Sequence, residues 1–156
     1  MNEDIKTSGY VYGEIEYSNG TKKPFEFKNT VLTKGREALA ASLSNNFSGE
    51  YNFYISRMLF GDGGTSGGSK KYVNTNRNGL FGTTRASKPV ISSIDPNTPY
   101  QAIFTSVLRF DDANGYALNE MALQMGTGDF YSMVTFPDLN KTSDMQITFN
   151  WRLSFV

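Results

Sequence analysis

Eleven consecutive residues near the end of the sequence, Met145–Phe155, alternate strictly between apolar and polar side chains. A period of two places successive side chains on opposite faces of a β-strand, so the segment predicts a strand with one buried and one solvated face. At roughly 3.3 Å per residue this strand would span about 35 Å, which is enough to run the length of a sheet. Burying its apolar face would contribute at most on the order of 10 kcal/mol, so we expect the strand to be paired.

The composition predicts one β-rich domain, spanning residues 1–156. A length of 156 residues is ordinary for a single domain. Aromatic residues make up 14% of the chain, with 12 Phe and 9 Tyr, which favours a core of rings on pleated strands over a leucine-rich helical core.

The residue types that are missing exclude several classes of chemistry. The sequence has no Cys and no His, which removes disulfides, Cys/His zinc sites, cysteine nucleophiles and imidazole bases. We therefore expect no enzymatic activity, no cofactor and no small-molecule substrate.

The charge balance and the hydropathy of the chain argue against nucleic acids and membranes as partners. Lys+Arg and Asp+Glu both number 15, so no global basic field attracts nucleic acid. No apolar run approaches the length of a membrane span, and the first residues lack the basic and apolar regions of a signal peptide. We expect no nucleic acid or membrane partner, and synthesis in a cytoplasm.

Segments of strand character recur along the chain and are separated by Gly, Asn and Asp turns; they are 10–17, 24–28, 53–60, 102–110, 116–124, 130–136 and 145–155. One helix is predicted over 34–43, with Thr33 as its N-cap, Leu39 and Leu43 on one face, and an end at 44–46. A linker is expected over 137–144. The fold class is therefore mainly β, an antiparallel β-sandwich or curved sheet with one short α-helix.

Periodicity disappears between about residues 61 and 100, where Gly, Ser, Asn, Thr, Lys and Pro dominate. A long irregular loop inside a compact domain is usually functional or disordered, so this segment is the predicted interaction arm. Its candidate contact residues are the glycine-rich start, the cations and the one apolar pair: Gly61, Asp62, Gly63, Gly64, Lys70, Lys71, Arg77, Leu80 and Phe81.

Three chemical alternatives fit the sequence less well. The glycine-rich stretch resembles a phosphate-binding loop, but its spacing fails, because Gly63 is followed after four residues by Gly68-Ser69 and by no helix pattern. Asp62, Asp111, Asp112 and Asp129 could ligate calcium, although turn capping is the commoner role of such residues. Glu14 and Glu16 alternate on one exposed strand face, which offers no glycosidase environment.

Three strand residues are assigned structural roles. Glu120 lies in the apolar segment Leu118–Leu123, so it either faces solvent or is a buried acid paired with Arg57, Arg109 or Arg152. These arginines could instead pair across strands or line a subunit interface. Trp151 shares the face of Ile147 and Leu153 and is therefore expected in the core.

Several short motifs together resemble tailed-bacteriophage virion proteins of the tail-collar and fibre-attachment kind. They lie in the same order as in such proteins: Asn29–Leu43, Phe60–Thr65, Leu118–Leu123, Phe136-Pro137, Lys141-Thr142 and Ile147–Phe155. The Gly/Asn-rich middle of the chain departs from the shorter family pattern.

The resemblance implies a structural virion protein in the tail, collar or baseplate, with no catalytic residues to transfer. Its partners would be other virion proteins and further copies of itself in a homo-oligomer, since assembly can cover exposed strand edges. The alternatives are a capsid decoration protein or head fibre, and a carbohydrate- or receptor-binding β-sandwich module. The last of these gains support if Tyr10, Tyr12 and Tyr17 lie beside a concave groove.

Overall fold

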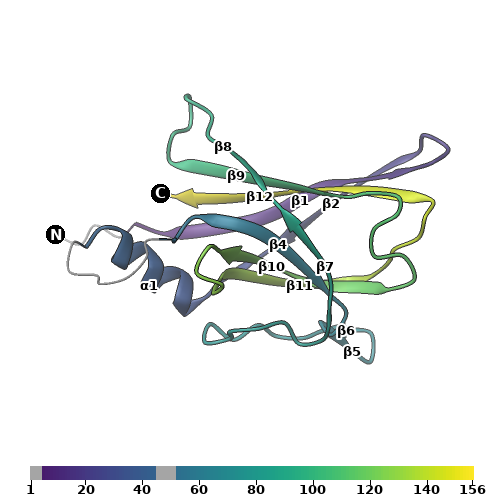
Figure 1. Ribbon diagram of the computed structural model, residues 1–156, viewed down its shortest axis with the longest axis horizontal. Coiled ribbons are helices and arrows are strands. Elements are labelled where there is room, and N and C mark those ends of the chain that lie inside the picture. The colour runs from purple at the N-terminus through teal and green to yellow at the C-terminus, as the bar shows by residue number, and fades with distance from the viewer. Residues whose placement is uncertain (1–4, 45–51) are drawn as a thin grey trace.

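Two five-stranded antiparallel sheets pack face to face in the computed structural model, which describes residues 5–44 and 52–156 (Figure 1). The first sheet has the order β2 (Lys22–Lys28), β1 (Thr7–Tyr17), β12 (Met145–Phe155), β9 (Gln101–Leu108), β8 (Ile91–Ser93). The second has the order β3 (Thr30–Val31), β11 (Phe130–Asn140), β10 (Ala117–Met125), β4 (Ile55–Gly61), β7 (Thr84–Pro89). A small hairpin, β5 (Thr65–Ser66) and β6 (Ser69–Lys70), and the helix α1 (Thr33–Ser42) complete the elements. The predicted mainly β sandwich is confirmed.

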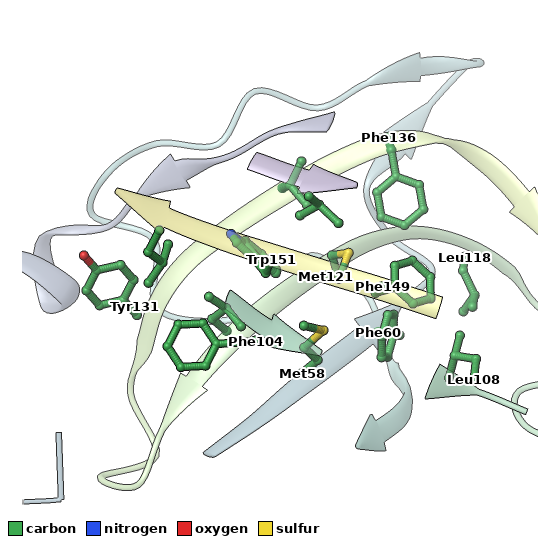
Figure 2. Packing of buried hydrophobic residues seen from close by; sticks show 14 of the residues in the cluster. Met58, Phe60, Phe104, Leu108, Leu118, Met121, Tyr131, Phe136, Phe149 and Trp151 are labelled. Carbon is green, nitrogen blue, oxygen red and sulfur yellow. The ribbon is translucent and has the colours of Figure 1, made fainter. Parts of the chain in front are cut away.

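The terminal strand β12 has the predicted bounds and lies in the middle of its sheet, between β1 and β9. Its buried face carries Ile147, Phe149, Trp151 and Leu153, so the alternation of the sequence is confirmed. Figure 2 shows Phe149 and Trp151 among core side chains from the facing sheet. Phe149 lies 4.7 Å from Phe60 between ring centroids, in a tilted arrangement that favours aromatic pairs.

Chain crossovers between edge strands link the two sheets at both sides of the sandwich. On one side the chain passes from β2 to β3 through Asn29, and both strands are edge strands. On the other side it passes from β7 to β8 through Val90, again between two edge strands. Each crossover therefore ties the edge of one sheet to the edge of the other.

The second sheet is buried on both faces. Met58, Phe60 and Met121 face the first sheet, whereas Leu59 and Ala122 belong to a separate cluster on the outer face. That outer cluster includes Val73, with Leu80 and Phe81 packed against it. The segment 62–83 thus covers the outer face of this sheet, below β10 and β11 in Figure 1.

The helix forms where predicted, but two of its details were wrong. Leu32, rather than Thr33, occupies the N-cap position, and the Thr33 hydroxyl donates a hydrogen bond to Asn76 Oδ1 instead of capping the helix. Leu39 packs on the core as expected, but Leu43 is 92% exposed because the helix ends one residue earlier. The predicted terminator extends to residues 45–46, which lie outside the described residues.

The irregular middle is shorter than predicted. Residues 84–89 and 91–93 form the edge strands β7 and β8, and β7 is paired with β4 from Arg57 to Gly61. The sequence pattern did not indicate these two strands, because most of their side chains are polar. An edge strand exposes one side to solvent and therefore needs little apolar surface. The expected linker over 137–144 is also too long, since β11 continues to Asn140.

Candidate functional site

A buried carboxylate anchors the glycine-rich segment to the sandwich. Glu120 in β10 is fully buried, and its carboxylate accepts hydrogen bonds from the backbone N–H groups of Gly63, Phe81 and Gly82 at 3.1, 2.7 and 2.8 Å. Hydrogen bonds to an ionised acceptor are stronger than neutral ones, and here they join two loop segments to one strand. Solvent exposure of Glu120 and its pairing with an arginine were therefore wrong predictions.

Asn119 extends the same anchor. Its Oδ1 accepts the N–H of Gly64 at 2.6 Å, and its Nδ2 donates to Thr65 Oγ1 and to Asp138 Oδ1, each at 3.0 Å. Hydrogen bonds from Asn119 and from Thr65 hold the pKa of the Asp138 carboxyl below its usual value. The pairing of β10 with β11 shifts register between Leu118 and Glu120, and such interruptions redirect side chains.

The glycines of this segment permit close backbone approach. A Cβ atom on Gly63 would lie 2.2 Å from the backbone nitrogen of Gly82, and one on Gly64 would lie 2.3 Å from the backbone carbonyl oxygen of Asn119. A Cβ atom on Gly61 would meet the Glu120 carboxylate at 2.5 Å. Only glycine fits these positions, so the glycine run serves packing against the chain's own backbone.

Asp62 adds a second set of contacts between the glycine-rich segment and the start of β7. Its carboxylate accepts a hydrogen bond from Arg85 Nε at 2.7 Å and another from the N–H of Thr83 at 3.1 Å. The hydrogen bond from Arg85 is the main reason that the pKa of Asp62 is lowered, against the opposing effect of burial. Asp62 thus joins its own segment to Thr83 and Arg85, which lie more than twenty residues further along the chain.

Two of the three cations predicted in this segment, Lys71 and Arg77, lie against the Phe81 ring. The Arg77 guanidinium carbon is 3.6 Å and Lys71 Nζ is 5.1 Å from the Phe81 ring centroid, both within cation–π range. Leu80 packs with Phe81 on the outer cluster, whereas Lys70 is exposed in β6. Most of the predicted interaction residues therefore contact the chain's own sheet, and their binding of a partner stays a prediction.

The remaining structural candidates divide between core and surface. Trp151 is fully buried, as expected. The Arg152 guanidinium lies 4.2 Å from the Tyr10 ring centroid, directly across the strand pair, and Arg57 donates to Ser87 on the neighbouring strand. Cross-strand contacts of these two arginines are therefore confirmed.

A groove lies beside the β2–β3 crossover. It has a volume of about 730 Å³ and is lined by residues of β1, β2 and β3, by Arg36 of α1 and by Arg152. Tyr10 lines it, and the Tyr12 ring lies 5.4 Å from the Tyr10 ring, whereas Tyr17 is at the other end of β1. No pattern in the sequence indicates this groove, because its walls come from segments far apart in the chain.

Sequence reasoning missed Asn119, Gly82 and Asp138 as parts of the anchor. The available signal was the polar pair Asn119-Glu120 inside an apolar strand, since a buried polar pair requires partners. Nothing in the spacing showed that these partners are backbone amides 38 to 57 residues away.

Within residues 5–44 and 52–156, no cluster of Asp and Glu side chains is arranged to hold a metal ion. In the same residues, no helix has the length and apolar character needed to cross a membrane. Comparisons with protein-family models, with curated proteins and with solved structures find no match to this chain.

Proposed function

We propose that this protein is a structural component of a tailed-phage virion, in the tail, collar or baseplate region, and acts through contacts between subunits. The observation that carries the proposal is that separate motifs of the resemblance meet in space. The glycine-rich turn after β4 is hydrogen-bonded to Asn119 and Glu120 of the motif in β10. An ordered set of motifs with mutual contacts is what a shared structural framework would preserve.

Two further motifs of the resemblance, the helix motif and Lys141-Thr142, also make structural contacts within the fold. Gly35 of the helix motif lies against Tyr131, where a Cβ atom would be 2.4 Å from its carbonyl oxygen. Lys141 is buried, and its Nζ donates to Asn114 Oδ1 and to the Thr142 carbonyl. The close approach at Gly35 and the hydrogen bonds of Lys141 hold backbone and loops in place, which suits a protein that works as a rigid building unit.

The exposed features suit a subunit with neighbours. Ile91, Ile94 and Tyr100 are exposed around the edge strand β8, and this segment projects from the sandwich at the upper left of Figure 1. Exposed apolar side chains beside a sheet edge favour association with another chain.

Immunogold electron microscopy of purified particles, with an antibody against this chain, tests the proposal. Label at the tail, neck or baseplate supports it. Label over the head favours the alternative of a capsid decoration protein or head fibre, and no label on intact or opened particles contradicts a virion role.

A receptor- or carbohydrate-binding module is the second candidate, and the position of Tyr10 in the groove, with Tyr12 beside it, favours it. Trp151 is buried and cannot serve as a sugar platform. A glycan array separates the two candidates, because selective binding to one sugar class would place the receptor function first.

A further inference from the structure

The groove at the β2–β3 crossover continues into a second hollow. The second hollow has a volume of about 350 Å³ and shares Lys28 and Thr30 with the first. It extends the groove past the segment 70–73 toward β11. The two hollows therefore adjoin at Lys28 and Thr30.

The groove concentrates positive charge in a chain with balanced charges. Its walls carry five cationic residues and one acidic residue: Lys28, Arg36, Lys70, Lys71, Arg152 and Glu26. The ion pairs among the described residues involve other cations, on Lys22, Lys34, Arg85 and Lys88. Clefts lined by one sign of charge attract ligands of the opposite sign.

Polar groups at the same groove lack partners. Asn29 Oδ1, Asn29 Nδ2 and Arg152 Nε are buried, and none has a hydrogen-bond partner among the residues that the structure describes. Buried polar atoms without partners are costly and need an explanation. A polar ligand in the groove, reached by a small rotation of either side chain, would provide those partners.

Two free sheet edges border the groove. Within residues 5–44 and 52–156, β2 pairs with β1 and β3 pairs with β11, and neither has a strand on its other side, so each leaves one edge without a strand partner. An extended peptide can add to such an edge through main-chain hydrogen bonds. A carbohydrate or a nucleic acid has no peptide backbone for this mode, and the charge balance of 15 to 15 offers no wider basic field for a long polyanion.

We propose that this groove binds an extended acidic segment of a partner protein, with carboxylates against its cations and the peptide backbone along the β2 or β3 edge. The inference goes beyond the proposed virion role, because it concerns a binding site and holds whatever assembly contains the chain. Absence of the protein from virions would leave the peptide measurement unchanged.

Fluorescence anisotropy with the whole protein and a labelled peptide of alternating Asp and Val tests the site. A peptide of alternating Lys and Val is the matched probe of opposite charge. We expect binding of the acidic peptide alone, with weaker binding as salt increases. Binding of neither peptide, equal binding of both, or a preference for a single-stranded oligonucleotide would overturn the proposal.

Charge reversal on one strand supplies the matched variants. Lys28→Glu lies in the groove, and Lys23→Glu lies on the same strand outside both hollows, and both side chains are exposed. We expect Lys28→Glu to weaken acidic-peptide binding by about tenfold or more and Lys23→Glu to change it by less than about twofold. Equal effects of the two variants would show a nonspecific charge attraction and contradict the site.

The backbone part of the proposal has its own test. Methylating alternate backbone nitrogens of the acidic peptide removes hydrogen-bond donors without changing its charge. We expect one of the two methylation registers to weaken binding by about tenfold, because an added strand uses alternate N–H groups. Unchanged binding in both registers would overturn strand addition at this edge.

Discussion

Two irregular segments of similar polar composition behave differently in this fold. Residues 62–83 lie against the second sheet and are tied to Glu120 and Asn119 by backbone hydrogen bonds. Residues 94–100 project from the sandwich, with local backbone hydrogen bonds from the Thr98 N–H to the Asp95 carbonyl and from the Gln101 N–H to the Thr98 carbonyl. Only the end of the segment is tied to the sheet among these bonds, where the Tyr100 carbonyl accepts the N–H of Phe155 in β12.

The difference shows that glycine and polar residues do not by themselves make a segment mobile. The glycines of the first segment have no Cβ atom, so its backbone can lie close to the sheet. There the buried carboxylate of Glu120 accepts hydrogen bonds from three backbone N–H groups. The second segment meets no such side chain. An irregular segment is therefore fixed by buried polar partners on the element that it crosses.

The largest expected effect comes from removing the anchor. Glu120→Ala leaves three backbone donors without their acceptor and creates a small cavity, so we expect a loss of about 3–5 kcal/mol in the free energy of unfolding. Urea denaturation followed by fluorescence of the single tryptophan, Trp151, measures it. The exposed Glu26→Ala is the control and should cost less than about 0.5 kcal/mol. Similar losses in both variants would contradict the anchoring role.

The second largest loss of stability is expected at a glycine that is packed closely against backbone. Gly63→Ala places a Cβ atom 2.2 Å from the Gly82 nitrogen, so the two backbones must separate. We expect a loss of about 2–3 kcal/mol, as in overpacked cores. Gly79→Ala lies in the same segment with nothing within 4 Å of the added Cβ, and it should be nearly neutral by the same urea measurement. A neutral Gly63→Ala would mean that the segment is not held against its own backbone.

The ion pair of Asp62 and Arg85 should contribute less and in a pH-dependent way. The lowered pKa of Asp62 means that its stabilisation is present above the unfolded-state value near about pH 4 and is lost as pH falls through the folded-state pKa. We expect Asp62→Asn to cost about 0.5–1 kcal/mol at neutral pH, with the difference from the parent protein shrinking in acid. A difference independent of pH between neutrality and strong acid would contradict the charged pairing.

The projecting segment should be the most tolerant. Ile94 is 59% exposed, so Ile94→Ser should change the unfolding free energy by less than about 0.5 kcal/mol in the isolated protein. Thermal unfolding of the two proteins side by side checks this. A clear loss of stability would show that residues 94–100 pack on the body and would remove the contrast between the segments.

Much of the fold was predictable because local patterns determine it. The alternation over 145–155 predicts β12 with its observed bounds, and the segments predicted over 10–17 and 24–28 pair as the first hairpin, with strands that extend to 7–17 and 22–28. The edge strand over 84–89 was missed, because its pairing with β4 relies on backbone bonds rather than on an apolar face.

The anchor was less predictable for a physical reason. Glu120 stood out as a polar residue in an apolar strand, but its partners are N–H groups, which every residue except proline carries. Sequence therefore shows that a buried acid needs donors without showing which ones. The groove combines β1, β2, β3, α1 and β12, and only the fold brings these together.

Hydrogen exchange of the parent protein and of Glu120→Ala, which removes the acceptor of all three amides, tests the anchoring of the glycine-rich segment most directly. The account predicts slow exchange at the amides of Gly63, Phe81 and Gly82 in the parent, fast exchange over 94–97, and loss of the protection at those three amides in the variant with Trp151 fluorescence unchanged. Exchange over 61–64 and 80–83 that is as fast as over 94–97 in the parent, or equally slow in both proteins, would contradict it.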